Sequence, residues 1–517
     1  MNSPSDTQTQ VLIIGGGATG TAIARDLALR GVDCIVVEKD DINSGASGHN
    51  HGLLHSGARY VASDRQTASE CRAEGAILKS VAAQTIEDTG GYFVAVQGDD
   101  ERYVADFPSL CARAGIAARA VDLAAARALE PALSQRTIAV FEVPDASIDP
   151  FRLSLESMAH ARSLGARLMR RSRVLGFERD GRRIRAARIQ RGGEELRVEA
   201  EQIVNAAGAW ARELALLAAA PIEMTYFKGT LLVTHTRLAS RVVNRLRPPA
   251  DADILMPGGT VSLVGTTSTP VDALDDIYPT TAEADLIVAE AARMLPALES
   301  MRYIRAFAGV RPLVGAAGGG GRAISRGHAL FDHEDQGLDN LATITGGKLT
   351  TCRLMAERVA DLVCRRLGVT RPCLSATTPL PAAPECGWTE PGRSARASMR
   401  SHARDDTLLC ECELVPGRAV DAIYDALRPQ GDAPTLTDIG LRSRVGKGAC
   451  QGAFCAPRTV AHLYNRGDFQ VRRGLAEIVD FFGERWRGER AVLWGEQLAQ
   501  AELMEALHCG LFGEELH

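Results

Sequence analysis

A glycine-rich turn between an apolar strand and a helix constrains the fold of this chain more than any other feature. The apolar run 11–14 leads into Gly15, Gly17 and Gly20, spaced G-x-G-x-x-G, and apolar residues then recur at helical spacing. A second strand is expected at 33–37 (DCIVV), after that helix. This order of strand, glycine turn, helix and strand predicts a βαβ unit of an α/β domain with a Rossmann-type sheet.

Each residue type in this motif has a role at a dinucleotide site. Gly15 permits the tight turn, Gly17 lets the backbone approach a pyrophosphate, and Gly20 lets helix and strand pack closely. The helix N-terminus offers free N–H groups and a positive dipole end to the phosphates. Glu38, after the second strand, is an acceptor for ribose hydroxyls and disfavours a 2′-phosphate, which argues against NADP. The motif does not separate NAD from FAD, and the alternative is a glycine-rich turn in another kind of α/β protein.

Length and composition set the class of protein. A chain of 517 residues with 45% hydrophobic and 24% charged residues predicts a soluble globular protein of two or three domains, without a membrane span. Residues 1–10 are polar and lack the features of a secretory signal, so we expect a cytoplasmic protein. The net charge of −5 gives no general attraction to nucleic acid. We expect the twelve cysteines to be thiols or metal ligands rather than disulfides.

Later segments return to the predicted sheet. Residues 203–210 (IVNAAGAW) and 341–347 (LATITGG) each have the pattern of a strand followed by a small-residue turn, and three alternating strands between 174 and 200 predict a β-meander. We assign to the dinucleotide domain about 8–90, 145–220 and 340–372, and to an interleaved, sheet-based substrate domain about 91–144 and 221–339. The proline-rich stretch 373–404 predicts a linker, and 405–517 a small, mainly helical C-terminal domain.

Five motifs together resemble those of the FAD-dependent glycerol-3-phosphate dehydrogenase family, especially its anaerobic branch. They are the glycine motif with Glu38, SGASGHNHGLLHSGARY (44–60), AGVRPLV (308–314), TGGKLTTCR (345–353) and a C-terminal set of cysteines. The resemblance covers nearly the whole chain, from residue 8 to 372 as the oxidoreductase and beyond it to the tail. It implies a D-amino-acid oxidase-like fold and the oxidation of sn-glycerol 3-phosphate to dihydroxyacetone phosphate.

Under this resemblance the glycine motif binds FAD, and the flavin reaches toward 44–60 and the turn at 346–348. The implied cofactor-binding residues are Gly15, Gly16, Gly17, Thr19, Gly20, Glu38, Lys39, Ser47, Gly208, Gly347 and Lys348. A helix N-terminus and Lys348 beside the flavin would stabilise the negative charge of its reduced form.

The resemblance also implies that Arg59 and Arg311 hold the substrate. A guanidinium suits this role because its planar fork binds phosphate bidentately and stays protonated. Outside these motifs, either residue would be read as a surface arginine.

A base must take the hydroxyl proton while the C2 hydrogen leaves as hydride. His55 is the histidine best placed by sequence, His49 and His51 are its rivals, and a loop histidine with a purely hydrogen-bonding role is the alternative. Leu231 stands where aerobic members of the family carry a histidine, which removes one candidate base. The predicted catalytic set is His55, Arg59, Arg311 and Lys348.

The C-terminal cysteines have a spacing that suits an iron–sulfur cluster. Cys410 and Cys412 form a C-x-C pair, and Cys450 and Cys455 form a C-x4-C pair after 37 intervening residues, which supplies the four thiolates of a [2Fe-2S] cluster. Structural zinc sites usually carry C-x2–4-C pairs, so zinc and empty thiols are the alternatives. The spacing resembles a bacterioferritin-associated ferredoxin-like domain. The cations expected to offset the cluster's charge are Arg442, Arg444, Lys447 and Arg458.

Partners and competing functions follow from the same resemblance. It implies other dehydrogenase subunits that carry electrons to a quinone pool, and hence a peripheral location on the cytoplasmic face of the inner membrane. A FAD-dependent 2-hydroxy-acid or amine oxidoreductase is the first alternative, because a fold specifies its cofactor better than its substrate. An electron-transfer or scaffold flavoprotein is the second.

Overall fold

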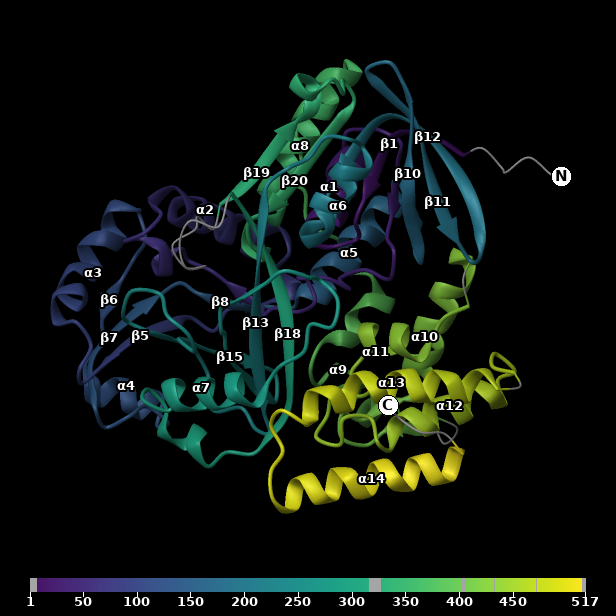
Figure 1. The fold of residues 1–517 in the computed structure, drawn as a ribbon. Helices are drawn as coiled ribbons and strands as arrows, with labels where there is room; N and C mark the ends of the chain where they lie inside the picture. The colour runs from purple at the N-terminus through teal and green to yellow at the C-terminus, as the bar shows by residue number, and fades with distance from the viewer. Residues whose placement is uncertain (1–6, 316–326, 402–405, 432, 471, 514–517) are drawn as a thin grey trace.

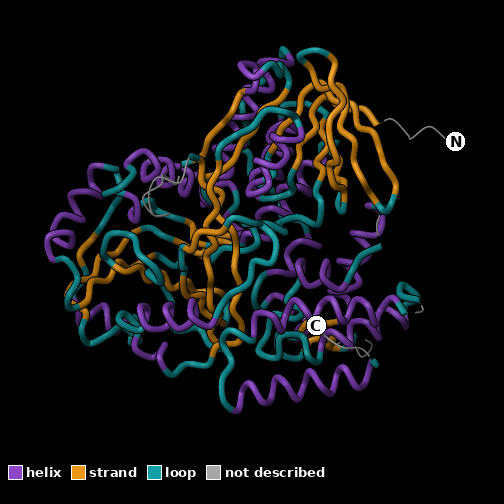
Figure 2. The backbone as a smooth tube through the Cα atoms, viewed as in Figure 1, coloured by secondary structure: helices purple, strands orange, loops and turns teal. Residues whose placement is uncertain are grey.

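The computed structural model describes residues 7–315, 327–401, 406–431, 433–470 and 472–513. Figure 1 shows a first sheet with its helices, a second sheet beside it, and a group of helices at the C-terminal end of the chain. We call the first sheet with its helices the first part, the second sheet with its helices the second part, and the remaining helices the C-terminal region. Figure 2 shows that strands run through the first and second parts and that helices dominate the C-terminal region. The expected α/β fold with a mainly helical C-terminal region is confirmed.

The first sheet carries the glycine motif at the end of a central strand. Its strands are β1 (Thr7–Ile14), β2 (Cys34–Val37), β9 (Arg167–Met169), β10 (Ser172–Asp180), β11 (Arg183–Arg191), β12 (Glu194–Asn205), β19 (His328–Asp332) and β20 (Leu341–Gly346). Strands β9, β2, β1, β12 and β20 pair in parallel in that order, as in a doubly wound sheet. The predicted meander is confirmed as β10, β11 and β12. Its last strand and the predicted strand at 203–210 are one element, because β12 leaves β11 and continues beside β1.

Alternating side chains of β1 face two different core layers. Val11 and Ile13 pack under helices, whereas Leu12 and Ile14 pack on the side of the meander, and all four are at most 5% exposed. Burial on both faces accounts for the unbroken apolar run. The helices over this sheet are α1 (Ala18–Leu29), α5 (Pro150–Ser163), α6 (Ala211–Leu217) and α8 (Cys352–Leu367).

The second sheet is mostly antiparallel. Its strands are β5 (Gly91–Val96), β6 (Arg119–Ala120), β7 (Thr137–Val143), β13 (Met224–Thr234), β14 (Val242–Arg245), β15 (Ile254–Gly258), β16 (Val261–Gly265), β17 (Thr269–Val271) and β18 (Tyr303–Val314). The chain thus builds this sheet from 91–143 and 224–314. β19 differs from the expectation for 221–339, because it pairs with β20 in the first sheet.

A small sheet and several helices complete these two parts. The small sheet joins β3 (Leu53–Leu54), β8 (Ala146–Ile148) and β4 (Ile86–Glu87). The remaining helices here are α2 (Arg65–Val81), α3 (Glu101–Arg113), α4 (Leu123–Leu129) and α7 (Thr281–Ala291). Short 3-10 turns include η1 (Ala58–Tyr60), η3 (Gly208–Trp210) and η6 (Leu349–Thr351).

The described part of the expected linker is folded against the body of the protein. It forms the turn η7 (Pro384–Thr389) and the helix α9 (Arg393–Ser401). Leu380 and Cys386 are buried in two core clusters of the preceding part. The backbone N–H of Leu380 donates to the carbonyl of Val81 at 2.6 Å. These contacts hold the stretch in place, so it does not act as a free tether.

The C-terminal region, residues 406–513, has its own core and touches both sheets. Its elements are β21 (Leu408–Cys410), β22 (Val415–Pro416), α10 (Gly417–Leu427), α11 (Leu436–Arg442), α12 (Cys455–Asn465), α13 (Arg473–Glu489) and α14 (Glu496–Phe512). Val420, Phe482 and Trp486 are among the side chains of its core. Helix α11 packs against α5 of the first part, and α13 packs against β18 of the second sheet. Figure 1 shows these helices at the lower right, under the first sheet and beside the second.

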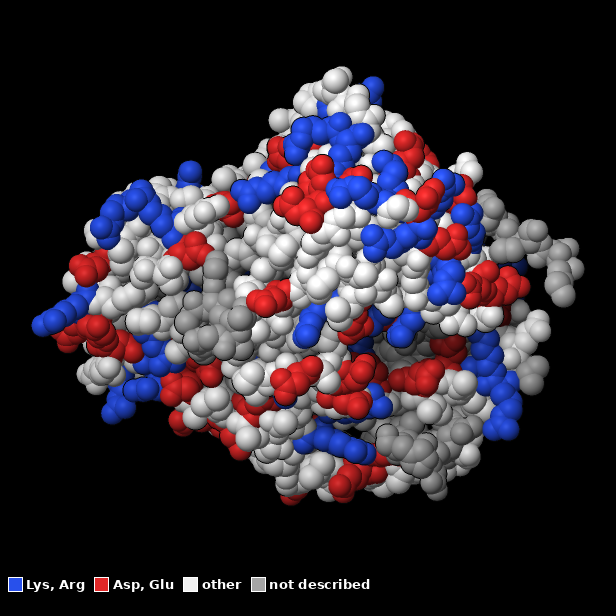
Figure 3. All heavy atoms as spheres, turned by 45° about the horizontal axis from the view of Figure 1, so that its top comes forward, with Lys and Arg blue, Asp and Glu red and all other residues white. Residues whose placement is uncertain are grey.

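Surface charge is mixed on the face drawn in Figure 3, where blue and red side chains alternate over the meander. Ion pairs such as Arg185 with Asp180, Arg188 with Glu195 and Arg197 with Glu178 lie on these strands. Among the described residues, no helix combines the length and apolar character needed to cross a membrane.

Candidate active site and cysteine cluster

A cavity of about 880 Å³ lies where the two sheets meet. Its lining comes from the glycine turn, the segment 44–63, residues 206–217, the end of β18 and the turn at 346–349. Four of the five motifs singled out in the sequence therefore converge on one cavity. Its volume is within the range of small-molecule and cofactor sites.

The glycine turn leaves no room for side chains. A Cβ atom on Gly15, which has φ of +117°, would lie 2.5 Å from the carbonyl oxygen of Ala206. A Cβ atom on Gly20 would lie 1.9 Å from the carbonyl oxygen of Gly15. Gly20 therefore lets α1 approach the strand–helix turn, as predicted. It is not among the residues that line the cavity.

The N-terminus of α1 is open toward the cavity. Gly17 is its N-cap and supplies no side-chain cap, while Gly17, Ala18 and Thr19 all line the cavity. Ser47, from the loop after β2, accepts a hydrogen bond from the N–H of Ala18 at 3.0 Å. The arrangement suits a pyrophosphate because the positive end of the helix dipole favours an anion there and the N-cap glycine has no side chain that would occupy the site.

Glu38 stands at the expected end of β2 and is buried against the turn. One carboxylate oxygen accepts from the N–H of Gly16 at 2.6 Å, and the other accepts from the N–H of Asp40 at 2.9 Å and from the Ser44 hydroxyl at 3.3 Å. Burial raises the pKa of Glu38 above its ordinary value. A carboxylate has about four acceptor positions, so these three bonds orient Glu38 and leave capacity for a ribose hydroxyl.

Two further residues that were predicted to bind the cofactor, Lys39 and Gly208, line the cavity. The ammonium of Lys39 lies 3.6 Å from the centre of the Trp210 ring, a cation–π contact. Gly208 lines the cavity with φ of +57°, a conformation that favours glycine. Sequence reasoning did not single out Trp210 as a site residue, although it closes the motif IVNAAGAW.

Arg59 reaches the cavity from η1 and is held by a buried acid. One of its terminal nitrogens lies 2.9 Å from a carboxylate oxygen of Asp253 and 3.3 Å from the carbonyl oxygen of Ala250. The other terminal nitrogen, Nη1, is buried and has no hydrogen-bond partner among the described residues. Asp253 is fully buried and also pairs with Arg247 at 2.8 Å. Asp253 was not predicted, because nothing in its local sequence distinguishes it from a structural acid.

Arg311 reaches the same cavity from β18. Strand β18 pairs with β13 in the register that places Arg311 opposite Phe227. The guanidinium donates to the carbonyl oxygen of Thr267 at 3.0 Å and to the hydroxyl of Thr266. A Cβ atom on Gly229 of β13 would lie 2.3 Å from a terminal nitrogen of Arg311, so this glycine makes room for the guanidinium.

Two histidines of the segment 44–60 lie beside these cations. The rings of His51 and His55 have centroids 6.0 Å apart. Burial lowers the pKa of His51 to about 3, with further lowering by the positive charges of Arg311 and Arg59. Burial also lowers the pKa of His55 well below its ordinary value. Both imidazoles are therefore neutral at physiological pH, the state in which a histidine accepts a proton.

The other histidine and the turn lysine also line the cavity. The Nδ1 atom of His49 lies 2.9 Å from the carbonyl oxygen of Gly45, so its ring is tied to its own loop. Lys348 precedes η6 and not a regular α-helix, and its ammonium lies 4.4 Å from the centre of the Tyr60 ring. Leu231 is 1% exposed and lines the cavity, so the position is apolar in this chain.

The four C-terminal cysteines form a chain of thiol contacts. Cys455 interacts with both Cys410 and Cys450, and Cys450 interacts with Cys412. The thiol of Cys455, with backbone N–H groups, holds the pKa of Cys450 down to about 5. Cys410 and Cys455 are 1% exposed, whereas Cys412 is exposed. Within the part of the chain that the structure describes, no three His, Cys, Asp or Glu side chains surround a point where one metal ion would be held.

Glycines bring backbone close to these sulfurs. The N–H of Gly446 donates to the sulfur of Cys455 at 3.2 Å. A Cβ atom on Gly448 would lie 2.4 Å from the Cβ atom of Cys412. The backbone at Gly446 and Gly448, just before Cys450, therefore passes close to Cys412 and Cys455.

Each of the four cations expected near the cluster has a partner of its own. Arg442 forms a two-pronged ion pair with Asp41 of the first part, so its charge is compensated there. Arg444 pairs with Glu413 at 3.0 Å, and Arg458 pairs with Glu411 at 2.8 Å. The ammonium of Lys447 lies 4.9 Å from the centre of the Phe151 ring, against the first part of the molecule.

Comparisons with known proteins agree with this architecture. A family model described as FAD dependent oxidoreductase matches residues 10–362. The A subunit of the anaerobic glycerol-3-phosphate dehydrogenase of Escherichia coli K12 is 40% identical, and the alignment covers 100% of this chain and 99% of that protein. The Haemophilus influenzae protein of the same name is also 40% identical, with 98% of this chain and 94% of that protein covered.

A solved structure shows the same fold. The glycerol-3-phosphate dehydrogenase of Bacillus halodurans, complexed with FAD, superimposes with a TM-score of 0.65 at 20% identity, and the match covers 94% of this chain and 96% of that one. The helix N-terminus with glycine at its N-cap and the oriented carboxylate of Glu38 form a site of the kind that FAD requires. The chain belongs to the family of FAD-dependent oxidoreductases and, within it, to the A subunits of the anaerobic glycerol-3-phosphate dehydrogenases.

Proposed function

We propose that this chain oxidises sn-glycerol 3-phosphate to dihydroxyacetone phosphate. The observation that carries the proposal is the convergence of Arg59 and Arg311, from two different elements, on the cavity that the glycine motif also lines. Two guanidiniums in one partly buried site match a phosphate dianion in charge and in hydrogen-bonding geometry. The names of the relatives at 40% identity point to the same substrate.

Different side chains of the cavity bind the substrate and accept the proton in this alcohol oxidation. Arg59 and Arg311 bind the phosphate and thereby orient the secondary alcohol. A neutral imidazole, His51 or His55, accepts the hydroxyl proton. When bound, FAD supplies the acceptor for the hydride that leaves C2. Lys348 places a positive charge at the same end of the cavity, where it favours an anionic product or cofactor.

The charge of the cavity weighs against the amine alternative. An ammonium substrate would face Arg59, Arg311 and Lys348 together, and like charges in a partly buried site repel strongly. A 2-hydroxy acid carries one negative charge fewer than the phosphate dianion and would engage the paired arginines less completely. The cation set therefore favours a phosphorylated alcohol.

The test is an anaerobic titration of the full-length, FAD-loaded chain. We expect sn-glycerol 3-phosphate to bleach the oxidised-flavin absorbance with one dihydroxyacetone phosphate formed per flavin, and glycerol, lactate and glycine to leave it unchanged. Arg311→Ala is expected to lose the response, whereas Arg185→Ala, on the exposed face of β11, retains it. Bleaching by lactate or glycine at lower concentration than by glycerol 3-phosphate would favour the alternative enzyme. A flavin that no substrate bleaches would favour the scaffold function.

We further propose that Cys410, Cys412, Cys450 and Cys455 hold a [2Fe-2S] cluster. Thiol contacts among all four, close glycine backbone and a sulfur-directed N–H group support the assignment. A pairwise chain of thiols, and not one central point, suits two irons with two thiolates each.

Anaerobic reconstitution with iron and sulfide tests this assignment. We expect two irons and two labile sulfides per chain and an EPR signal after reduction. Replacing Cys450 and Cys455 together by Ser is expected to abolish the signal, whereas Cys111→Ser, which removes a buried thiol far along the chain, leaves it intact. Stoichiometric zinc in the wild-type chain would reject the cluster.

We propose that electrons leave through partner subunits to a membrane acceptor. The relatives are named as subunits, and no described helix of this chain spans a membrane. Fractionation of cells that express the chain with and without its partner subunits tests this. We expect membrane association only in the presence of the partners, and membrane-bound chain in their absence would contradict it.

A further inference from the structure

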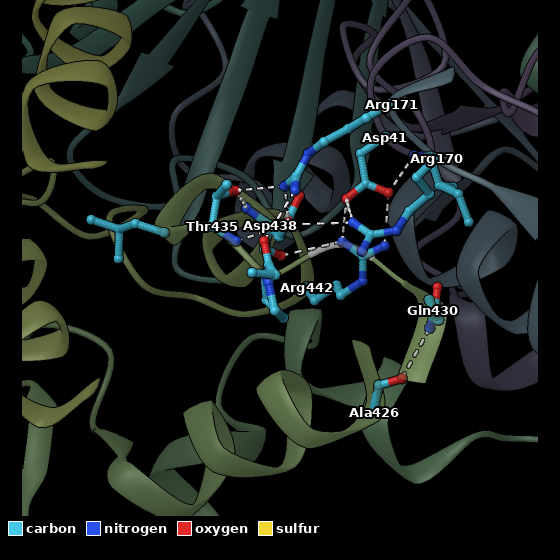
Figure 4. A network of polar contacts seen from close by, with 12 residues as sticks. Asp41, Arg170, Arg171, Ala426, Gln430, Thr435, Asp438 and Arg442 are labelled. Atoms are coloured by element: carbon cyan, nitrogen blue, oxygen red, sulfur yellow. Dashed lines mark hydrogen bonds and ion pairs between the residues drawn. The ribbon is translucent and has the colours of Figure 1, made fainter. Parts of the chain in front are cut away.

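A buried network of charges joins the FAD-binding part to the C-terminal region. Both carboxylate oxygens of Asp41 are bound by Arg442, at 2.5 and 2.9 Å. Asp41 lies three residues after Glu38 in the loop that follows β2, and Arg442 is the last residue of α11. Figure 4 shows the guanidinium of Arg442 pointing toward the carboxylate of Asp41, although 401 positions separate the two in the sequence.

Two arginines at the end of β9 complete the network. A terminal nitrogen of Arg170 lies 3.3 Å from both Asp41 and Asp438, and Arg171 lies 2.5 Å from Asp438. Asp438 in turn closes the capping box of α11 with Thr435. Three guanidiniums thus face two carboxylates at a largely buried interface, and each carboxylate is shared between the two parts of the molecule.

Asp41 sits within the loop that orients Glu38. The N–H of Asp40 and the hydroxyl of Ser44, on either side of Asp41, both donate to the Glu38 carboxylate. In the same loop the N–H of Asn43, a residue with φ of +66°, donates to the carbonyl oxygen of Gly16 at 3.2 Å. Asparagine tolerates this left-handed conformation better than most residues, and the hydrogen bond to Gly16 fixes it here.

The neighbouring strand binds this loop as well. The N–H of Arg171 donates to the carbonyl oxygen of Asp40 at 2.9 Å, and the N–H of Ser172 donates to that of Glu38 at 2.8 Å. Ser172 lines the FAD cavity. Asp41 and Arg171, two members of the charge network, therefore lie on backbone segments that are hydrogen-bonded to each other. These segments also carry Glu38 and Ser172, which line the cavity.

We propose that Arg442 is a positioning residue of the FAD site. By holding Asp41 from the C-terminal region, it fixes the loop 40–44 and hence the carboxylate of Glu38. Docking of the C-terminal region and binding of FAD then strengthen each other. Without Arg442, the loop keeps the contact of Asp41 with Arg170 but loses the two shorter bonds.

The first measurement is the dissociation constant of FAD from the full-length apoprotein. We expect Arg442→Gln to weaken FAD binding on the order of tenfold. Asp41→Asn is expected to weaken it more, because three guanidiniums would then face one carboxylate. Arg442→Lys, which keeps the charge but not the two-pronged geometry, is expected to fall between the wild type and Arg442→Gln.

A matched control separates this effect from looser docking in general. Glu484→Gln removes the 2.8 Å ion pair between α13 and Arg305 of β18, which is a contact of the same region with the second sheet. We expect its FAD affinity to equal that of the wild type. If Arg442→Gln does not fold, Asp41→Asn carries the test from the other side of the interface.

The second measurement is hydrogen exchange with and without FAD. Because coupling is reciprocal, FAD is expected to slow exchange in α11 of the wild type and to have no effect there in Arg442→Gln. A merely structural Arg442 would not make the exchange of α11 depend on FAD. Wild-type FAD affinity in both Arg442→Gln and Asp41→Asn, or α11 exchange that ignores FAD, would overturn the proposal.

Discussion

The two ends of the FAD cavity are built by different means. At the nucleotide end, backbone of one short segment supplies the shape, and Gly15 and Gly20 exclude side chains by close approach. At the proposed substrate end, charged side chains such as Arg59, Arg311 and Lys348 come from separate segments and are oriented by ion pairs and neighbouring strands. A defect at the first end should therefore abolish cofactor binding, and a defect at the second should spare the cofactor and impair the reaction.

Gly20→Ala is expected to have the largest effect. The added Cβ atom would lie 1.9 Å from the carbonyl oxygen of Gly15, and backbone atoms on both sides cannot move aside. We expect a loss of more than about 4 kcal/mol in stability, with no bound FAD. Thermal unfolding and the flavin content of the purified chain measure this. Gly483→Ala, in α13 with open space around it, is the control and should retain FAD.

Arg311→Ala should show the opposite pattern. Removing one proposed partner of the phosphate should lower kcat/KM for glycerol 3-phosphate. The expected loss of transition-state stabilisation is on the order of 2–5 kcal/mol, while the flavin content stays that of the wild type. Gly229→Ala tests the same guanidinium more gently, because the added Cβ atom would displace the guanidinium of Arg311 without removing its charge. Loss of FAD in either variant would break the distinction between the two ends.

The pH dependence of the reaction sharpens the substrate end further. Burial and then the charges of Arg311 and Arg59 hold the pKa of His51 near 3, so His51 should add no acid limb at its ordinary value of 6.5. The substrate phosphate has its own second pKa of about 6 and limits kcat/KM there, so the base is read from kcat at saturating substrate. Bound phosphate offsets the arginine charges, so the acid limb of kcat should lie above pH 3. His51→Asn should remove this limb if His51 is the base, and its persistence would assign the proton transfer to His55.

The low pKa of His51 also makes the free energy of unfolding depend on pH. The pKa of His51 is lower in the folded than in the unfolded chain, so unfolding takes up a proton between pH 6.5 and about 3. The stability of the fold is therefore undiminished by His51 above pH 6.5 and decreases as the pH falls through that window. Thermal unfolding of wild type and His51→Asn across this range measures it, and equal slopes would contradict the low pKa.

Lys39→Met is expected to have the smallest effect. It removes the cation–π contact with Trp210 at the nucleotide end but keeps the length of the side chain. We expect FAD binding to weaken by about 0.5–1 kcal/mol without a change in kcat. A large loss would show that the ammonium contacts the cofactor directly, and this outcome would make the nucleotide end depend on charge as well as shape.

Local patterns in the sequence predicted those elements whose geometry depends on neighbouring residues. The glycine turn, the apolar strand β1 and the meander all appeared where expected, because tight turns and strand alternation are encoded over a few positions. The proline-rich stretch after residue 372 shows the opposite case. Its composition is typical of a linker, yet Leu380 and Cys386 are buried, because tertiary neighbours supplied partners that composition does not reveal.

The sequence by itself determined the chemistry that this chain can hold: a dinucleotide turn, two arginines suited to a phosphate, candidate histidine bases and two pairs of thiols. Only the tertiary structure decided how they meet. Arg311 reaches the cavity of Arg59 because β18 pairs along β13 past Gly229, Asp253 binds Arg59, and Arg442 binds Asp41 across two parts of the molecule. The physical reason is that a residue's type sets which partners it can bind, whereas the long-range packing of strands and helices sets which partners are within reach.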